Sequence, residues 1–316
     1  MVESKHRWKA WLYLSPAIVL LLIFTVYPIF NTVRISFLEG YNAMTAVTGA
    51  KCTIGFDNFK QVVSYQGFLT CLKNTMLLCV LTVPISTVLA LLIAVCLNAI
   101  KPLQKLLQTI FFLPYVTNSI AIGMVFAAMF NMVGTGFGGE NPIIITAGII
   151  NNFLGLFGIE PINWINAGST YWANIFVMVI YIVWNALPFK ILILLGGLQS
   201  INKQYYDAAK VDGTSKVRVF SKITVPLLSP MLAYVVITGF IGGFKEYSSI
   251  VGIFGDTMGP PGDPYRLNTM VGYIYRQIDG DMPLYGRASA AAIILFGIIF
   301  VVTMINLYVS KKKTHY

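Results

Sequence analysis

Six long apolar segments, separated by polar ones, run through this sequence. A window of about 19 residues places them at residues 11–37, 73–97, 107–132, 171–195, 226–250 and 286–309. Each segment has the ~20 residues that a helix needs to cross ~30 Å of hydrocarbon. The apolar runs are continuous, as in "AIVLLLIFTVYPIF", and do not alternate at every second position as the strands of a membrane barrel do. We therefore predict an all-α integral membrane protein with six transmembrane helices.

The composition agrees with this prediction, since 57% of the residues are hydrophobic and only 11% are charged. The basic N-terminus followed by an apolar run also has features of a secretory signal peptide. However, that run exceeds the roughly 7 to 15 residues of a signal-peptide core, and no convincing small-residue cleavage site precedes Arg34. We therefore interpret the run as an uncleaved first span.

The net charge of +10 is unevenly distributed along the chain. If the N-terminus lies inside, 13 of the 22 Lys and Arg residues fall on that side of the membrane, and most acidic residues fall in the opposite loops. The positive-inside rule therefore predicts that both termini are cytoplasmic. The basic residues of the inner side are Lys5, Arg7, Lys9, Lys101, Lys105, Lys203, Lys210, Lys216, Arg218, Lys222, Lys311, Lys312 and Lys313. The acidic residues of the outer side include Asp57, Glu140, Glu160, Asp256, Asp263, Asp279 and Asp281.

Two of the expected outer segments are long. Residues 133–170 contain a short apolar part that glycines and Pro161 interrupt, which predicts an interfacial or re-entrant helix and not a seventh span. Residues 251–285 are rich in Gly and Pro and predict an irregular connection. Cys52 and Cys71 both fall on the outer side, and the sequence leaves open whether they form a disulfide, because it does not give their distance.

The sequence offers no site for catalysis, a cofactor or a metal. The stretch "GTGFGG" at residues 134–139 has the glycine spacing of a dinucleotide loop, but it follows a membrane span and not a strand. There is no GxxxxGK[ST] phosphate loop and no GxSxG nucleophile elbow. The two histidines, His6 and His315, lie in the charged tails away from other metal ligands. We therefore expect neither an enzyme nor a bound cofactor.

The polar segment between the fourth and fifth spans has a pattern of its own. Residues 202–211 mix small, apolar and charged side chains and predict a short helix, which Gly213 ends. Pro226 ends a second short helix or opens the next span. The apolar face of that second helix is predicted to contain Val217, Val219, Phe220 and Ile223. Two helices that meet at a glycine would form a compact knuckle, and the alternative is an ordinary positive-inside loop.

The stretch "DAAKVDGTSKVRVFSKITVPLLSP" resembles the EAA loop of ABC importer permeases. Asp207 stands in place of the family's Glu, and Thr214 stands in place of its second Ala. Three further stretches, "SPAIVLLLIFTVYP", "LPFKILILLGGLQSI" and "YGRASAAAIILFGIIFVVTMI", resemble the permeases of the carbohydrate-uptake importers, the MalF/UgpA-like group. The loop residues that match the family in type and spacing are Asp207, Ala208, Ala209, Asp212, Gly213, Phe220, Ile223, Pro226 and Pro230.

The resemblance implies the type I ABC importer fold, also called MetI-like. It implies one transmembrane domain over residues 1–316, with a core of spans at about 73–309 and a coupling loop at 199–226 that docks into a cleft on a cytoplasmic ATPase. The expected partners are a second homologous permease, two ATP-binding subunits, an extracytoplasmic sugar-binding protein and the lipid of a bacterial cytoplasmic membrane, with no nucleic acid.

The residue types of the loop suit a coupling role. Asp207 offers a negative charge to an Arg or Lys of the ATPase. Ala208 and Ala209 keep the surface low enough to enter a cleft. Gly213 permits a positive φ, which costs other residues roughly 1 kcal/mol or more. The predicted coupling residues are these four with Asp212, Phe220 and Pro226.

Polar and aromatic residues within the spans are candidates for a solute path. Aromatic faces stack on sugar rings, and an amide both donates to and accepts from hydroxyls. The candidates are Asn118 in the third span, Trp184, Asn185 and Phe189 in the fourth, and Gly243, Glu246 and Tyr247 in the fifth. The resemblance implies that positions 185, 189, 243 and 246 lie on the sugar path.

These assignments have structural alternatives. Glycines in spans more often allow close packing of helices, and Glu246 with Lys245 also marks the end of a helix. Asn118 is equally suited to bond a neighbouring helix. Lys190 and Arg34 are long enough to snorkel.

We therefore predict a permease subunit of a binding-protein-dependent ABC importer, which moves an oligosaccharide or related polyol and is driven by separate ATPases. One alternative is a self-contained secondary transporter or channel, which would need intramembrane coupling acids or discontinuous helices in paired halves. Another is an importer permease for a non-carbohydrate solute such as a phosphodiester or a peptide.

Overall fold

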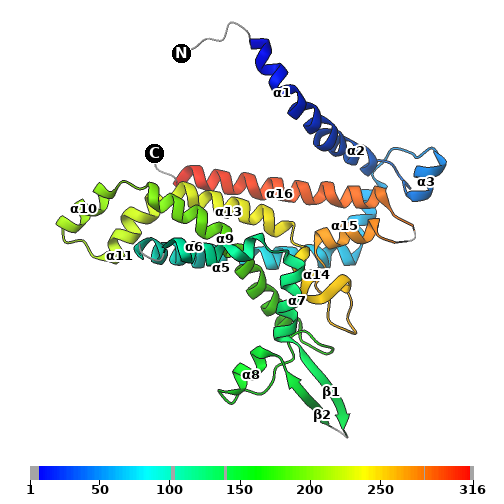
Figure 1. Cartoon of the computed structure of the whole chain (residues 1–316). Coiled ribbons are helices and arrows are strands. Elements are labelled where there is room, and N and C mark those ends of the chain that lie inside the picture. The colour runs from blue at the N-terminus through cyan, green and yellow to red at the C-terminus, as the bar shows by residue number, and fades with distance from the viewer. Residues whose placement is uncertain (1–6, 101–103, 139–140, 281, 314–316) are drawn as a thin grey trace. The chain divides into compact units, whose positions relative to one another are not determined.

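The computed structural model describes residues 7–100, 104–138, 141–280 and 282–313. Its secondary structure is almost entirely helical (Figure 1). The chain forms two compact units, each of which is described by itself. The first comprises the residues up to Leu69 together with Tyr273–Gly297, and the second comprises Thr70–Gly272 together with the residues from Ile298 onward.

Four helices are long and apolar enough to cross a membrane, and they correspond in order to the first, second, fourth and sixth predicted spans. They are Trp8–Ser36, Gln66–Ala99, Tyr171–Ser200 and Tyr285–Lys311. Two bent helix pairs raise the number to as many as six if each pair is one span: Leu106–Val116 with Ser119–Phe130, and Lys216–Leu227 with Ser229–Phe244. The prediction of a multi-pass helical membrane protein is confirmed.

In the first unit, α1 (Arg7–Leu21) and α2 (Tyr27–Ser36) are joined by a π-helical turn into one helix. The apolar N-terminal run thus has the helical length predicted for the first span. The short helices α3 (Ala43–Thr48) and α4 (Asp57–Ser64) follow it. Asn58 on α4 is buried and donates hydrogen bonds from Nδ2 to the carbonyl oxygens of Ser36 and Leu38, which fixes α4 against the end of α2.

The second unit contains most of the remaining helices, although α5, α15 and α16 run through both units. In chain order these helices are α5 (Gln66–Ala99), α6 (Gln104–Phe112), α7 (Ser119–Phe130), α8 (Ile149–Gly155), α9 (Tyr171–Ser200), α10 (Lys203–Val211), α11 (Lys216–Val219), α12 (Val225–Leu227), α13 (Ser229–Phe244), α14 (Ser248–Phe254), α15 (Met270–Ile278) and α16 (Tyr285–Lys313). The side chains of Ala94 on α5, Leu194 on α9 and Val235 on α13 are fully buried in one apolar cluster. This cluster holds α5, α9 and α13 together around the region described below.

The third predicted span, residues 107–132, is not a single helix. α6 and α7 meet at an angle of 98°, after a 3-10 turn that contains Pro114. The side chain of Asn118 then caps α7, because its Oδ1 accepts hydrogen bonds from the backbone N–H groups of Ile120 and Ala121. The start of α7 is therefore set by a capping residue, Asn118, that lies within the apolar run.

The fifth predicted span, residues 226–250, is also interrupted. The preceding helix continues through Pro226 to Leu227 and bends by 67° before α13. α13 then ends at Phe244, and a new helix, α14, begins only at Ser248. Glu246 consequently lies in a break between two helices and not within one.

The half-length helices α7 and α14 pack closely against each other. A Cβ atom on Gly123 of α7 would lie only 2.6 Å from the Cα of Gly252 on α14. Only glycine permits this approach, since any side chain would meet backbone. The helices that follow the two breaks, α7 and α14, are therefore in direct contact.

Residues 132–147 form a β-hairpin, which the sequence analysis did not predict, and the short helix α8 (Ile149–Gly155) follows it in the part of residues 133–170 where an interfacial or re-entrant helix was expected. β1 (Met132–Gly138) pairs antiparallel with β2 (Asn141–Ala147), with Met132 opposite Ala147. The β-branched run "IIIT" within β2 favours a strand over a helix. The segment 251–285, which was expected to be irregular, contains the helix α15.

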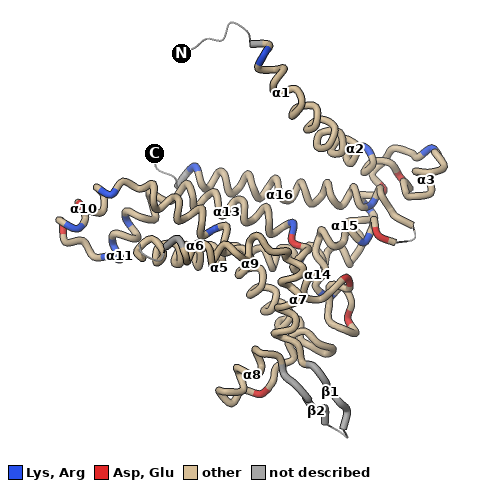
Figure 2. Tube along the Cα trace, viewed as in Figure 1, with Lys and Arg blue, Asp and Glu red and all other residues tan. Residues whose placement is uncertain are grey.

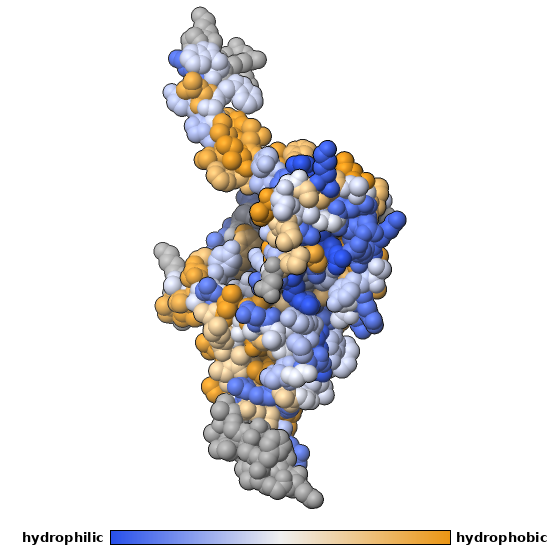
Figure 3. All heavy atoms as spheres, turned by 90° about the vertical axis from the view of Figure 1, so that its right-hand side faces the viewer, coloured by the Kyte–Doolittle hydropathy of each residue, from blue (hydrophilic) through white to orange (hydrophobic). Residues whose placement is uncertain are grey.

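Charges are separated along the second unit. Lys and Arg residues outnumber Asp and Glu residues near α10, α11 and the C-terminal end of α16, whereas acidic residues lie near α8 and after α14 (Figure 2). A space-filling view shows hydrophilic and hydrophobic residues gathered in separate areas of the surface (Figure 3). Such a separation of charges is typical of helices whose two ends face different aqueous compartments.

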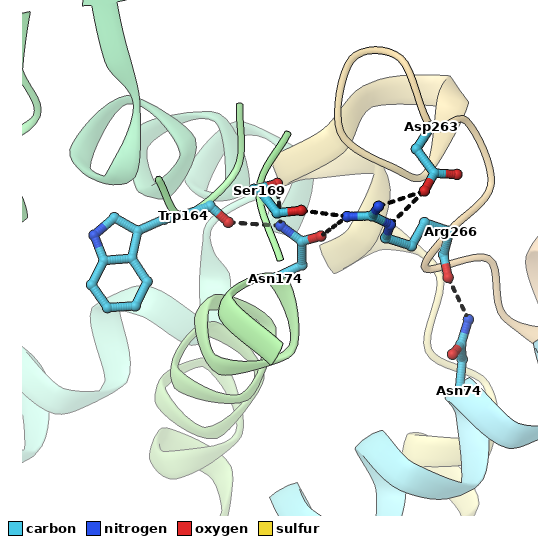
Figure 4. A network of polar contacts seen from close by, with 6 residues as sticks. All are labelled: Asn74, Trp164, Ser169, Asn174, Asp263 and Arg266. Carbon is cyan, nitrogen blue, oxygen red and sulfur yellow. Dashed lines mark hydrogen bonds and ion pairs between the residues drawn. The ribbon is translucent and has the colours of Figure 1, made fainter. Parts of the chain in front are cut away.

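Polar side chains also join segments that are far apart in the sequence (Figure 4). We call this set the Arg266 network; it consists of Asn74, Trp164, Ser169, Asn174, Asp263 and Arg266. Arg266 forms an ion pair with Asp263 at 2.6 Å and donates from Nη1 to the carbonyl oxygen of Ser169 at 2.6 Å. Asn74 on α5 donates to the carbonyl oxygen of Arg266 at 2.9 Å. The network thus ties α5 and the start of α9 to the loop before α15.

Candidate functional site

The polar segment after α9 forms the compact knuckle that the sequence predicts, and we use this name for residues 202–227. Asn202 caps α10 by accepting from the backbone N–H of Gln204 at 3.0 Å. The helix ends at Gly213, whose φ of +64° is accessible to glycine at low cost. The N–H groups of Gly213 and Thr214 donate to the carbonyl oxygens of Lys210 and Ala209, which completes a Schellman motif.

The second half of the knuckle runs as one helical segment through α11, a π-helical turn at Phe220–Thr224 and α12. The hydroxyl groups of Tyr206 and Thr224 lie 3.3 Å apart and join this segment to α10. Val217 was predicted to lie on an apolar inner face, but its side chain is 77% exposed. The turn is therefore set by local backbone geometry and supported by the contact between Tyr206 and Thr224.

The predicted coupling residues occupy different environments. Asp207, Ala208 and Asp212 are exposed, whereas Ala209 is buried. Phe220 is half-buried and Pro226 is exposed. A recess of about 410 Å³ lies on the knuckle, and Ala208, Ala209 and Asp212 line it. Two carboxylates and a small residue are thus available to a partner.

A second candidate site is a cavity of about 280 Å³ between α5, α9 and α13, which we call the central cavity. It brings together Asn185, Phe189, Gly243 and Glu246, the four positions that the resemblance implied for a sugar path. Hydroxyl-bearing residues, Thr82 and Ser86 from α5 and Thr238 from α13, complete the polar part of the wall. The volume is close to the lower end of ordinary ligand pockets, which starts at about 300 Å³.

The polar groups of the central cavity keep hydrogen-bonding capacity. Asn185 donates from Nδ2 to Ser119 Oγ at 3.2 Å. Glu246 accepts at Oε1 from the backbone N–H of Ser249 at 3.2 Å. A carboxylate has two oxygens and about four acceptor positions, and an amide has two donors and an acceptor. Both side chains are therefore able to take up further bonds from hydroxyl groups.

An aromatic wall closes one side of the central cavity. Phe189 stacks on Tyr115, with ring centroids 5.8 Å apart and an angle of 19° between the rings. Tyr115 comes from the 3-10 turn between α6 and α7, and it also lines the cavity. The sequence analysis missed Tyr115, because the bend that brings it to Phe189 is not visible in the apolar pattern.

The other three candidates for the solute path lie outside the cavity lining. Trp184 packs against Phe126, with ring centroids 5.2 Å apart. Tyr247 packs against the apolar cluster around Ile250. Asn118 is the cap of α7, so its side chain bonds its own helix and not a neighbouring one.

Lys190 is the main charged residue that the sequence analysis misjudged. It was expected to snorkel, but it is only 4% exposed, and its Nζ points to α5. It donates to the carbonyl oxygen of Val83 at 3.2 Å, to Ser86 Oγ at 2.7 Å and to Thr87 Oγ1 at 2.9 Å. Lys190 and Ser86 both line the central cavity.

The glycines of α13 allow neighbouring helices to pack closely and also leave space in the central cavity. A Cβ atom on Gly243 would lie 2.8 Å from Cys79 Sγ, and one on Gly239 would lie 3.2 Å from Lys190 Nζ. A Cβ atom on Gly242 would meet nothing within 4 Å. The structural alternative thus holds for Gly239 and Gly243, which line the cavity and also allow α5 and α9 to approach α13.

Within the described residues, no group of three or more His, Cys, Asp and Glu residues is arranged to hold a metal ion. No disulfide bond is present among the four cysteines, all of which lie in described ranges.

The chain is similar to known transport proteins. A family model described as a binding-protein-dependent transport system inner membrane component matches residues 86–315. A lactose transport system permease protein of Rhizobium radiobacter is 28% identical over 308 residues, which cover 96% of this chain and 95% of the relative. An arabinooligosaccharides transport system permease protein of Halalkalibacterium halodurans is 31% identical over 302 residues, which cover 94% and 86%. A solved bacterial ABC transporter involved in the import of the acidic polysaccharide alginate shares the fold, with a TM-score of 0.76, 23% identity and coverage of 98% of each chain.

Proposed function

The chain belongs to the family of binding-protein-dependent transport system inner membrane components, and from this premise we propose that it carries a carbohydrate across a membrane as one permease subunit of an ABC importer. The similar permeases named above serve lactose and arabinooligosaccharide transport systems, which favours an oligosaccharide as the solute. The observation that carries the proposal is the central cavity, because an amide, a carboxylate and stacked aromatic rings surround one volume there.

In this proposal the central cavity holds a sugar during transit. The stacked rings of Phe189 and Tyr115 offer an apolar surface to one face of a sugar ring. Asn185 and Glu246 exchange hydrogen bonds with its hydroxyl groups. Binding by a few bonds suits transport, since a solute that is held too tightly is released too slowly.

The knuckle transmits the work of ATP hydrolysis to the helices in this proposal. It has a rigid turn at Gly213. It connects α9 to α13, and both of these helices line the central cavity. Asp207 and Asp212 are exposed and able to pair with cationic side chains of an ATPase. A push on the knuckle would therefore reach both helices at once.

One knuckle engages one ATPase, so the working importer needs more than this chain. We propose a complex with a second homologous permease, two ATP-binding subunits and an extracytoplasmic receptor for the sugar. The basic residues near the knuckle and at the end of α16 favour an arrangement in which the knuckle and both termini face the cytoplasm of a bacterial cell. Residues 1–316 act as one transmembrane domain in this proposal.

Reconstitution tests the proposed function. The chain is placed in liposomes alone, and in parallel with the second permease, the ATPases and the receptor. We expect ATP-dependent uptake of an oligosaccharide only by the full complex. Uptake by the chain alone would contradict the proposal and favour a self-contained secondary transporter, for which the two helix breaks and Glu246 are the relevant features.

A further inference from the structure

We propose that Lys190 makes the central cavity selective for carbohydrates that carry a negative charge, such as a uronic acid or a sulfonated sugar. The inference rests on the proposed function, and it names the class of solute. It concerns a residue for which the family resemblance implied no role in the solute path.

The bonds of Lys190 are those of a charged ammonium group. Its three N–H donors meet three oxygen acceptors on α5. The hydroxyl groups of Ser86 and Thr87 donate onward to the carbonyl oxygens of Thr82 and Val83, so their remaining lone pairs face Lys190. This arrangement accommodates a cation and keeps it in place.

The charge of Lys190 lacks a compensating carboxylate. All three acceptors are neutral oxygens, and within the described ranges the one ion pair of the protein joins Arg266 to Asp263. A buried cation without a countercharge is costly. Ionisable residues in membrane spans typically mark solute paths, and a charge in a cavity walled by apolar helices acts over several ångströms. An anionic group of a solute would supply the missing countercharge.

Glu246 gives the cavity a direction. Gly239 lies beside Lys190 Nζ, and α13 continues for five residues to Phe244, about 7.5 Å at 1.5 Å per residue, before the break that contains Glu246. The central cavity is therefore lined by a cation beside Gly239 and by a carboxylate beyond the end of α13. A solute with an acidic group at the Lys190 end and hydroxyl groups at the Glu246 end satisfies both, whereas the reverse orientation places two negative charges together.

The experiment compares two probes in the complete importer, reconstituted with its receptor in proteoliposomes. The first probe is trigalacturonate, and the second is the neutral trisaccharide obtained by reducing its carboxyl groups. Lys190→Met removes the charge at nearly constant length, and Lys190→Arg retains the charge. Lys245→Met is the matched control, because Lys245 is exposed at the end of α13 and does not line the central cavity.

We expect the parent importer to take up trigalacturonate in preference to the neutral trisaccharide. Lys190→Met should lower uptake of trigalacturonate at least about tenfold more than uptake of the neutral probe, because the charge that attracts the anionic group across the cavity is lost. Lys190→Arg should keep the preference, and Lys245→Met should change neither rate. The receptor is the same throughout, so a difference between variants reports on the permease.

Two outcomes would overturn the inference. If Lys190→Met lowers the uptake of both probes equally, Lys190 serves only to hold α9 against α5. A parent that takes up the neutral probe at least as fast would exclude selectivity for anions even if Lys190→Met does not assemble. If the importer moves only neutral carbohydrates, the proposed function stands and this inference is wrong. If the complex moves no carbohydrate of either kind, both are wrong.

Discussion

The Arg266 network and the central cavity both place polar side chains inside the same helical unit, but they use them differently. In the Arg266 network each of the six side chains has a partner within the network or beside it. Asn174, for example, donates to the carbonyl oxygen of Trp164 at 2.7 Å and to Ser169 Oγ at 2.9 Å. In the central cavity Asn185, on the same helix, donates one bond at 3.2 Å and faces an open volume. Saturated polar groups hold a structure together, whereas polar groups with spare capacity beside a cavity suit a solute.

The largest expected effect comes from replacing Asn by Leu on α9, once in the Arg266 network and once in the central cavity. Asn174→Leu leaves the carbonyl oxygen of Trp164 and the hydroxyl of Ser169 without their donor, at about 1–3 kcal/mol for each buried group. Asn174→Leu should therefore lower the thermal stability of the purified complex strongly and reduce its yield, whereas Asn185→Leu should assemble like the parent. Equal stability of the two variants would remove the distinction on which the comparison rests.

A substitution in the knuckle should stop transport without changing the Arg266 network or the central cavity. Gly213→Val places a β-branched residue at a φ of +64°, and it should abolish uptake by releasing or uncoupling the ATPase while the cavity stays intact. Gly213→Asn is the matched control, because Asn tolerates this backbone conformation. Uptake and co-purification of the ATPase are measured for both variants. Asp207→Lys should weaken docking in the same assay by reversing a charge.

Normal uptake and ATPase association in Gly213→Val and Asp207→Lys would show that the knuckle is not the coupling element. The comparison between network and cavity would survive that result. The route by which ATP hydrolysis reaches the cavity would then have to be sought elsewhere in the chain.

Substitutions within the central cavity should slow transport without loss of structure. Asn185→Leu and Glu246→Leu each remove hydrogen bonds to sugar hydroxyls, worth about 0.5–1.5 kcal/mol each and up to about 3 kcal/mol where the carboxylate is charged. Uptake should fall strongly while the complex assembles and the receptor binds its sugar. If the assembled variants take up sugar within about twofold of the parent, both residues are structural.

The smallest expected effect concerns the aromatic wall. Phe189→Ala removes the ring that stacks on Tyr115 and offers a face to the sugar, a contribution of about 0.5–1.5 kcal/mol. Uptake should fall by roughly 2- to 13-fold on that basis. Phe189→Leu is the control for lost volume, since it keeps an apolar side chain without a flat ring. A rate in Phe189→Leu equal to that of the parent would argue against stacking.

The local pattern of the sequence determined the elements whose causes are local. The apolar runs predicted the helices that span a membrane, because the cost of burying backbone in lipid leaves a helix as the simplest solution for a long apolar segment. The knuckle was equally predictable, since a glycine with positive φ and a side-chain cap act over only a few residues. The motif of the loop then carried the resemblance from which the coupling residues followed.

Only the tertiary structure decided which polar groups meet. Lys190 was expected to snorkel, yet its acceptor Val83 lies 107 residues away in the chain, and Asn74 meets Arg266 across 192 residues. No local pattern reports such pairs. Tyr115 and Glu246 lie at bends and line the central cavity, and the helices that follow these bends meet at Gly123 and Gly252, which belong to different spans. Hydrophobicity selects segments for the membrane, but the pairing of buried polar groups is selected by packing among helices, because each such group must find its partner wherever the fold places one.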